Sequence, residues 1–403
     1  MNVLDMMLLG GAALLMVPAL VFTFEVALAC WPGTLRDAVP PGARRPALAV
    51  LVPAHNEALG IAATVTELRR QLAPADRLLV VADNCVDDTA ELARAAGADV
   101  LARRDATRRG KGYALDAGVR HLAATGAPEV VVIIDADCQA AEGALDRLAR
   151  AAHATGRPAQ ALYLMEPAAA ARNDAAGPSA QISAFAWQVK NGVRPLGLAR
   201  AGLPCPLFGT GMAFPWAIIV DAPLASGHIV EDMQLGVDLT LAGHAPLFVP
   251  QALVRSRFAA SQGAQDAQRR RWEHGHLDTL VNGVPRLLAT ALKRAQPASL
   301  AMALDLAVPP LALLVLLLSL MLAISAGWAA LGRAPAAAWV CASGLAAVGV
   351  AVLAAWARFG RESIPARTLI AAPWYAVRKV SMYLRFIVAR QTQWVRSQRD
   401  GEN

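Results

Sequence analysis

The chain is poor in charged residues and in cysteine for its length. Charged residues make up 17% of the 403 residues and hydrophobic residues 56%, whereas about 25% charged is usual for soluble domains. This balance excludes an intrinsically disordered chain and argues against a wholly soluble one. The five cysteines are scattered without a C-x-x-C pair. A disulfide framework or structural zinc site is therefore not expected, and a reducing compartment is favoured.

Three familiar catalytic or nucleotide-binding signatures are also missing. No G-x-G-x-x-G follows the first predicted strand, which argues against an NAD-binding domain. The basic segment 108–112 (RRGKG) lacks the Walker A spacing and its final Ser or Thr, which argues against an ATP-hydrolysing P-loop. No serine stands in a G-x-S-x-G turn, so a serine nucleophile of that type is not expected.

The positive charge is concentrated at the end of the chain. The net charge is +7, and residues 358–403 contain nine Lys or Arg against three Asp or Glu. This placement argues against a nucleic-acid-binding domain. It fits the positive-inside rule or a tail that meets anionic lipid. We expect residues 369–396, which mix aromatic and basic side chains, to form an amphipathic helix on the membrane; a soluble helix packed on the catalytic domain is the alternative.

Three long apolar runs predict membrane-spanning helices. They cover residues 6–31, 298–326 and 336–357, each long enough to cross a bilayer. Basic residues flank the sides of these runs that face the middle segment and the tail, which predicts that both lie in the cytoplasm. A cleaved signal peptide is the alternative for the first run, and a buried helical hairpin for the other two. Asp305 is costly against lipid, so we expect it to face other helices or the interface.

These features divide the chain into four parts. We predict an N-terminal transmembrane helix in 1–35, a cytoplasmic catalytic domain in 46–290, two transmembrane helices in 298–357, and a basic amphipathic tail in 358–403. The expected location is the inner (cytoplasmic) membrane, with several crossings.

The middle segment alternates strands and helices. Strands are predicted at 47–52, 77–82 and 129–134, with helical patterns between them. This alternation predicts an α/β fold with a largely parallel sheet and helices on both faces. In such sheets ligands bind beyond the carboxyl ends of the strands. The polar clusters 55–57 (HNE), 83–84 (DN) and 135–137 (DAD) follow those ends, which places a site there.

Asp135 and Asp137 are the strongest candidates for metal ligands. They stand two residues apart at the end of a buried strand, and oxygen ligands of this kind suit Mg²⁺ or Mn²⁺. A solvated turn is the alternative. Asp83, at the end of the preceding strand, can accept hydrogen bonds from a ribose or base. We expect Asp87 or Asp88 to cap the next helix.

Three further polar segments offer roles in binding or catalysis. Lys111, in the basic segment 108–112, can bring positive charge to a pyrophosphate, or the segment is an exposed loop. Glu231 and Asp232 precede a helical pattern, where capping is the ordinary role. Residues 268–272 (QRRRW) offer guanidinium groups for phosphate and an indole for a sugar face, or else form a basic helix on the membrane. His274 and His276 are not expected to form a metal pair, because their i, i+2 spacing separates them around a helix.

Together these segments resemble membrane-bound family 2 glycosyltransferases. The resemblance covers about residues 46–290 and consists of six elements in the family's order: 53–57 (PAHNE), Asp83, D-x-D at 135–137, 209–211 (GTG), 231–232 (ED) and 268–272 (QRRRW). The last matches the Q-[QR]-x-R-W signature of cellulose-synthase-like enzymes. Val230 replaces the usual Thr of the T-E-D element and leaves both carboxylates in place.

The resemblance implies a GT-A fold, in which a Rossmann-like, mixed and mostly parallel sheet is flanked by helices. It implies a nucleotide-sugar donor, here a UDP sugar, with Mg²⁺ or Mn²⁺ as cofactor. It assigns the roles as follows: nucleotide-sugar binding to Pro53, His55, Glu57, Asp83, Lys111 and Asp135; metal binding to Asp135 and Asp137; catalysis to Asp232, as general base, and Glu231; and diphosphate or acceptor binding to Gly209, Thr210, Gln268, Arg269, Arg271 and Trp272.

The implied reaction is a single displacement with inversion. An acceptor hydroxyl gives its proton to Asp232 and attacks the anomeric carbon, while the cation and arginines neutralise the leaving diphosphate. The expected acceptor is a growing surface polysaccharide or exopolysaccharide; a polyprenyl phosphate or another lipid is the alternative, and a decayed, non-catalytic subunit is the third. Expected partners are membrane lipids and other polysaccharide export or assembly proteins, with no nucleic acid.

Overall fold

The centre of the computed structural model, which describes residues 2–35, 37–40, 42–166, 177–228, 230–258 and 261–388, is an eight-stranded sheet. The strand order is β3-β2-β1-β4-β7-β6-β8-β5. Strands β1 to β4 run parallel, as do β6 and β8, whereas β7 is antiparallel to β4 and β6. The strands are β1 (Leu48–Ala54), β2 (Arg77–Asp83), β3 (Asp99–Arg103), β4 (Val130–Ile133), β5 (Gln139–Ala140), β6 (Ala159–Glu166), β7 (Met212–Pro215) and β8 (Leu247–Arg257).

Alternate side chains of the sheet face two separate hydrophobic cores. In β1, Val50 and Val52 belong to one core, and Ala49 and Leu51 belong to the other. The first core is covered by α2 (Ile61–Arg69), α3 (Thr89–Ala95) and α5 (Ala144–Thr155). The second is covered by α4 (Lys111–Thr125), α8 (Trp216–Ile219) and α9 (Glu231–Leu241). The predicted α/β class is confirmed, because a mixed, mostly parallel sheet carries helices on both faces.

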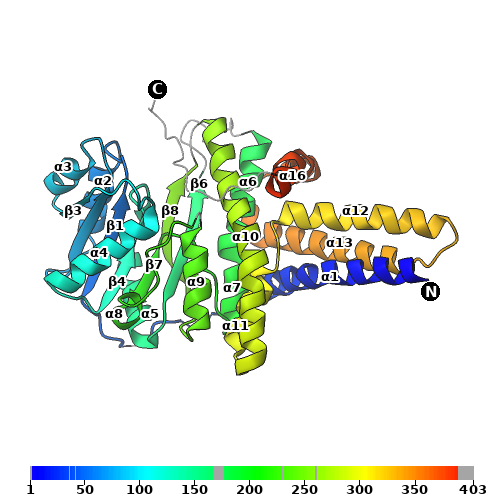
Figure 1. The fold of residues 1–403 in the computed structure, drawn as a ribbon, viewed down its shortest axis with the longest axis horizontal. Helices are drawn as coiled ribbons and strands as arrows, with labels where there is room; N and C mark the ends of the chain where they lie inside the picture. Colours follow the sequence, from blue (N-terminus) through cyan, green and yellow to red (C-terminus); the bar gives the residue numbers. More distant parts are fainter. Residues whose placement is uncertain are drawn as a thin grey trace.

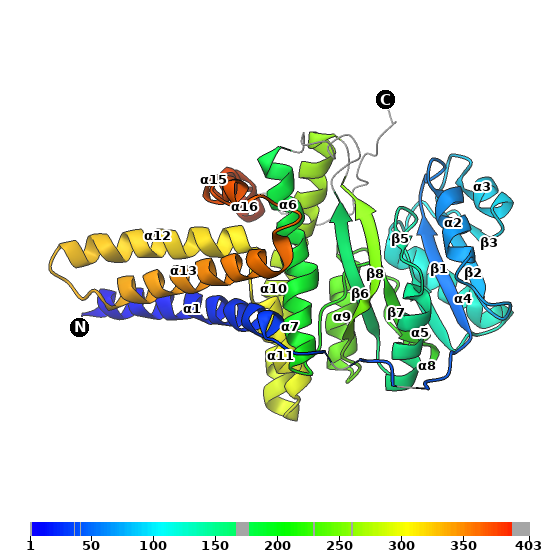
Figure 2. The same cartoon turned by 180° about the vertical axis from the view of Figure 1, so that it is seen from behind.

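Three helices are long and apolar enough to cross a membrane. They are α1 (Val3–Cys30), α12 (Leu311–Ala330), and α13 (Ala336–Ala355) with its continuation η3 (Trp356–Gly360). They pack against one another and project from one side of the sheet domain, with the N-terminus at their far end (Figures 1 and 2). Most of the surface of each apolar stretch is not buried within the chain, which agrees with predicted contact with lipid.

The second predicted span begins later than the sequence indicates. The apolar run 298–326 is not one helix, because Pro309 and Pro310 separate α11 (Pro297–Leu306) from α12. Proline lacks the amide proton needed within a helix, and it restricts the residue before it. Helix α11 packs instead against α10 (Gln262–Arg294) and α9, beside the catalytic domain.

The C-terminal segment forms short helices rather than one long helix. They are α14 (Ala366–Leu369), α15 (Ala372–Arg378) and α16 (Val380–Val388), and the remainder of the predicted tail lies outside the described residues. Arg269 of α10 donates to the Tyr375 hydroxyl at 3.1 Å, and Lys379 pairs with Glu273. These contacts with the catalytic domain favour the packed alternative for the part of the tail that is described.

A buried charge cluster joins the first span to the catalytic domain. Arg194, in α7 (Arg194–Arg200), donates to Glu25 of α1 at 2.5 Å and to Asp305 of α11 at 2.7 Å. All three side chains are at most 8% exposed. Asp305 therefore faces other helices, as its cost against lipid predicts.

Replacing Arg194 by Met should destabilise the protein strongly, because it leaves two carboxylates buried without their cation. Breaking a buried ion pair in this way costs about 3–5 kcal/mol. Thermal unfolding of the purified protein in detergent measures the effect. The triple variant Glu25→Gln, Arg194→Met, Asp305→Asn is the control and should recover most of the loss. If the unfolding temperature of Arg194→Met equalled that of the wild type, the cluster would not stabilise the packing of α1 on the rest of the chain.

Candidate active site

The carboxyl ends of β1, β2 and β4 bring three predicted polar clusters to one edge of the sheet. These strands are parallel neighbours in the order β2-β1-β4, so their ends lie side by side. The His55 ring nitrogen Nδ1 lies 2.6 Å from the backbone oxygen of Asp83. Asn56 and Asn84 turn the chain away from the sheet with φ of 54° and 53°, a region that asparagine tolerates better than most residues.

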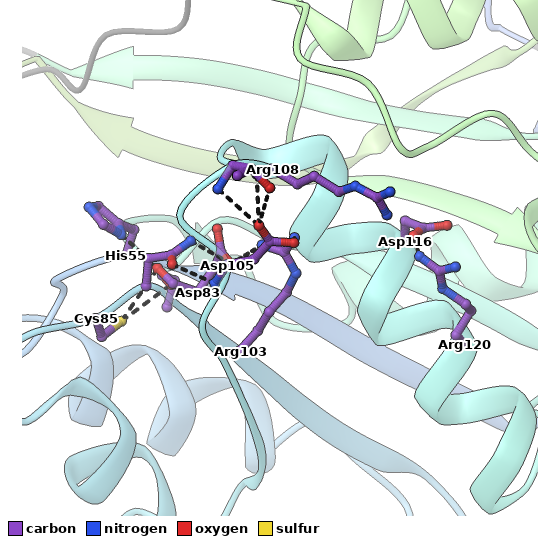
Figure 3. A network of polar contacts seen from close by, with 11 residues as sticks. His55, Asp83, Cys85, Arg103, Asp105, Arg108, Asp116 and Arg120 are labelled. Carbon is purple, nitrogen blue, oxygen red and sulfur yellow. Dashed lines mark hydrogen bonds and ion pairs between the residues drawn. The ribbon is translucent and has the colours of Figure 1, made fainter.

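Asp83 is held in a network of polar contacts shown in Figure 3. Its carboxylate accepts from Arg103 at 2.5 Å and from the Asn84 amide at 3.1 Å. Asp105 also pairs with Arg103, and it accepts from the backbone of Thr107 and Arg108. These backbone and hydroxyl bonds lower the pKa of Asp105 to about 2. The network thus orders the start of the basic segment 108–112 beside Asp83.

Sequence reasoning missed Arg103 and Asp105. A charged residue at the end of an edge strand looks like ordinary surface. The D-x-T-R run at 105–108 was the available signal, because Asp followed by Thr two residues later is typical of an Asx turn.

Asp87, rather than Asp88, holds the start of α3. Its carboxylate accepts from the Thr89 backbone at 3.1 Å and from the Ala58 backbone at 3.2 Å, while the Asp88 side chain makes no capping bond. The predicted capping role is confirmed for Asp87. It also ties α3 to the loop that follows β1, beneath the 53–57 segment.

Asp135 and Asp137 lie just after β4 with Cys138 beside them. One ligand atom from each of the three lies within 4.8 Å of the others. Asp137 is exposed, Asp135 is half-buried and Cys138 is buried, so the two carboxylates offer the accessible donors. Two carboxylate oxygens fit Mg²⁺ or Mn²⁺ better than they fit Zn²⁺. Burial raises the pKa of the Cys138 thiol well above its usual range, which makes the thiolate a poor competitor.

Lys111 lies between the Asp135 carboxylate and the segment 209–211. Its ammonium is 2.5 Å from Asp135 Oδ1 and donates to the Gly209 carbonyl at 2.7 Å. Burial lowers its pKa, but the carboxylates of Asp135, Glu231 and Asp232 outweigh burial and raise it. Lys111 is therefore a cation among the acidic groups, and it links the segment after β4 to the segment 209–211.

The segment 209–211 needs its glycines. Gly209 has φ of 91° and Gly211 has φ of 64°, both in the region that favours glycine. A Cβ atom on Gly209 would lie 3.1 Å from Asp232 Oδ2. Thr210 is fully buried, and its hydroxyl accepts from the Asp135 backbone at 3.0 Å. This turn therefore joins the D-x-D loop to the carboxylate of Asp232.

Glu231 and Asp232 line a hollow together with Lys111, rather than only capping α9. Neither side chain makes a capping hydrogen bond at the start of α9, where Val230 is the N-cap residue. Burial raises the pKa of Glu231 to about 7; Lys111 opposes this shift and Asp232 adds to it. Arg271 also acts on Glu231 electrostatically, so part of the QRRRW block lies near the acidic pair.

Replacing Glu231 by Gln should stabilise the protein at pH 8 and much less at pH 5. The folded pKa of Glu231, about 7, exceeds the ordinary value of 4.5. The stability it contributes is therefore complete below about pH 4.5 and is lost as the pH rises through 7. Thermal unfolding of both proteins without divalent cation, at pH 5 and pH 8, measures the difference, and we expect at least about 2 °C at pH 8. Equal midpoints at both pH values would contradict the assignment.

The QRRRW block, residues 268–272, lies on α10, and its side chains contact different parts of the chain. The Trp272 ring packs on the Trp187 ring with centroids 4.5 Å apart. Arg269 contacts Tyr375 and, at 3.7 Å, Asp266, so it faces the C-terminal helices. Gln268 Oε1 and Arg271 Nε are buried and have no hydrogen-bond partner among the residues that the structure describes. Arg271 is the residue of the block that acts electrostatically on Glu231, whereas Arg269 contacts Tyr375; the binding roles of the block stay a prediction.

The structure brings five of the predicted site residues into one group. Asp135, Asp232, Glu231, Lys111 and Gly209 interact directly or electrostatically. Asp83 lies on the same sheet edge, but its carboxylate contacts Arg103 and Asn84. The histidines contact different elements: His274 lies 3.4 Å from the Met382 carbonyl, and His276 lies 3.2 Å from the Leu306 carbonyl. The two rings therefore face different elements, as their i, i+2 spacing predicts.

Comparisons with known proteins agree with this fold. A family model described as glycosyltransferase-like family 2 matches residues 46–275, more than half of the chain. The structure is similar to mannosyltransferase PcManGT from Pyrobaculum calidifontis, solved with GDP-Man and Mn²⁺. That match has a TM-score of 0.57 and 18% identity and covers 95% of this chain and 100% of that chain. At this identity the likeness shows the fold alone.

A second solved structure is more remote. It is glucosyl-3-phosphoglycerate synthase from Mycobacterium tuberculosis, with Mn²⁺, UDP-Glc and phosphoglyceric acid. The match has 23% identity and a TM-score of 0.40 and covers 60% of this chain and 83% of that chain. No curated protein matches the chain.

Proposed function

This chain belongs to glycosyltransferase family 2, and from that premise we propose that it moves a sugar from a nucleotide sugar to an acceptor hydroxyl, with inversion and with Mg²⁺ or Mn²⁺. The observation that carries the proposal is the group formed by Asp135, Lys111 and Asp232. Lys111 pairs with Asp135 at 2.5 Å, and Asp232 lies across Gly209 from it. A metal-binding acid and a candidate base thus flank one cation.

The donor side of the site is proposed to be the sheet edge. Asp135 and Asp137 would hold the cation, which when bound neutralises charge on the diphosphate. Lys111 is placed to meet the same diphosphate. Asp83, His55, Pro53 and Glu57 would hold the nucleoside. PcManGT, with the same fold, was solved with GDP-Man and Mn²⁺, a donor and cation of these classes.

The acceptor side is proposed to begin at Asp232. Its carboxylate would take the proton of the attacking hydroxyl, with Glu231 beside it; removing that proton as the bond to the anomeric carbon forms lowers the barrier. No covalent intermediate is needed. Gly209, Thr210, Gln268, Arg269, Arg271 and Trp272 would bind the diphosphate or the acceptor.

The proposal includes two classes of acceptor. The QRRRW block, typical of cellulose-synthase-like enzymes, favours extension of a surface polysaccharide or exopolysaccharide at the inner membrane, with export proteins as partners. A polyprenyl phosphate or other lipid is the second candidate. The observation that favours it is a hollow lined by Met233, next to the proposed base, and by Asp305 at the end of α11.

A donor screen tests the proposed activity. The purified full chain in detergent would be given each common UDP-, GDP- and TDP-sugar, with Mn²⁺, with Mg²⁺ and with EDTA, and release of nucleoside diphosphate would be measured. We expect release from one or a few donors, dependent on the cation. Release at background level from every donor under every condition would support a non-catalytic subunit instead.

A further inference from the structure

A second hollow lies beside α9, the helix that carries the proposed base. It is lined by Lys190, Arg194, Met233, His276 and Asp305, among others. Met233 directly follows Asp232 in α9, and Asp305 lies near the end of α11, which contacts α1. The hollow is therefore lined both by α9, the helix that carries the candidate base, and by α11, which touches the first apolar helix.

Lys190 differs from Arg194, the other Lys or Arg of this hollow, because no carboxylate of the described residues forms an ion pair with it. Arg194 pairs with Glu25 and Asp305. Burial, together with Lys190 and Arg194, lowers the pKa of His276 to about 3, so its ring is neutral at pH 7. Within the described part of the chain the Lys190 ammonium makes no ion pair. It lies 6.0 Å from the centroid of the Trp187 ring.

The electrostatics around Lys190 include the candidate base. Burial lowers the pKa of Lys190, and Arg194 adds to that effect. The carboxylates of Asp232, Glu273 and Asp305 act in the opposite direction, so each lies within electrostatic range of the ammonium. An anion bound to Lys190 would offset the cost of holding this cation in a partly desolvated place.

The backbone that carries Lys190 is irregular in a way that typifies functional sites. Residues Val189–Val193 form a π-helical turn, η2, between α6 (Pro178–Gln188) and α7. Such turns are rare and occur frequently at functional sites. The next side chain, Asn191, is 1% exposed, and neither of its amide atoms has a hydrogen-bond partner. Trp187, one turn earlier, stacks on Trp272 of the QRRRW block.

We propose that Lys190 binds an anionic oxygen group of the acceptor, a phosphate or a carboxylate, in the hollow beside Asp232, with the Trp187–Trp272 pair packing on the adjoining part of the acceptor. The assignment rests on the proposed glycosyltransfer function and deepens it. An ammonium group can donate hydrogen bonds to the oxygens of one phosphate or carboxylate. That chemistry has two sources, the phosphate of a polyprenyl phosphate and the carboxylate of an acidic sugar.

The test measures binding and transfer with matched acids and neutral counterparts. Farnesyl phosphate is paired with farnesol, and cellobiouronic acid with cellobiose. Binding to the full chain with Mn²⁺ and UDP is followed by titration calorimetry, and transfer from the donor found in the screen by product analysis. The variants are Lys190→Met, Lys190→Arg, which keeps the charge, and the control Lys293→Met at an exposed position of α10.

We expect one acid to bind the wild type at least about tenfold more tightly than its neutral counterpart. Lys190→Met should remove that preference, Lys190→Arg should keep most of it, and Lys293→Met should have no effect. The acid that binds identifies the source. Cation-dependent release of nucleoside diphosphate without acceptor should stay within about twofold in Lys190→Met, which separates failure of this inference from failure of the proposed function.

Two results would overturn the inference. One is that neither acid binds the wild type more tightly than its neutral counterpart at millimolar concentration. The other is that Lys190→Met weakens acid and neutral compounds equally, or raises the KM for the donor, because Lys190 would then be structural or part of the donor site.

Discussion

Replacing Asp232 by Asn should lower sugar transfer at least about 100-fold while donor binding stays within about threefold of the wild type. Asparagine has the same shape as aspartate but cannot take up a proton from the attacking hydroxyl. Asp232 lies beside Gly209, across from the Lys111 that pairs with Asp135, so its loss should affect the acceptor step more than the donor. Nucleoside diphosphate release at saturating acceptor measures transfer, and calorimetry with UDP and Mn²⁺ measures donor-site binding.

Asp238→Asn is the matched control for this prediction. Asp238 lies on the same helix, α9, but pairs with Arg286 at 2.9 Å and accepts from Gln234, outside the hollow. Its replacement should leave transfer within about twofold. Transfer by Asp232→Asn at the wild-type rate would remove Asp232 as the base and leave Glu231 as the nearest other candidate.

Replacing Asp137 by Asn should abolish the stimulation of transfer by Mn²⁺ or Mg²⁺, with a loss of at least about 100-fold, comparable to removal of other groups that stabilise charge in a transition state. Asp137 is the exposed member of the D-x-D pair, and one of its carboxylate oxygens lies within 4.8 Å of a ligand atom of Asp135. An amide lacks the negative charge that hard divalent cations prefer. Wild type treated with EDTA should fall to the level of the variant.

Glu142→Gln is the control here, because Glu142 is an exposed acid five residues further along the same stretch of chain. It should keep full activity and full stimulation by the cation. If Asp137→Asn were still stimulated by Mn²⁺ as strongly as the wild type, the cation would have to bind elsewhere.

The residues at the carboxyl ends of the parallel strands could be predicted from the sequence, because each buried strand is a short run of apolar residues. The strands β1, β2 and β4 are continuous apolar runs, and their predicted ends differ from the observed ones by at most two residues. Polar residues that follow such runs must leave the sheet. The placement of His55, Asp83 and Asp135 at one edge therefore follows from pattern and parallel topology, although the roles proposed for these residues await experiment.

Contacts between segments that are far apart in the chain could not be predicted from the sequence. Lys190 and Arg194 follow a largely apolar helical stretch, residues 178–189, and nothing local indicates that Arg194 pairs with Glu25 and Asp305, which are 169 and 111 residues away. The π-helical turn at Val189–Val193 has no local signature either. Pro309 and Pro310 do indicate a break, and they separate α11 from α12 in the structure. The residues on both sides are apolar, so the apolar pattern predicts one continuous span.

The measurement that tests the account most directly is the position of manganese in crystals of the full chain grown with UDP and Mn²⁺, located by anomalous scattering. The account predicts a peak within roughly 2.5 Å of carboxylate oxygens of both Asp135 and Asp137, against the diphosphate and on the side of the hollow that Asp232 lines. A manganese peak remote from both aspartates, with UDP bound away from the edge formed by β1, β2 and β4, would contradict it.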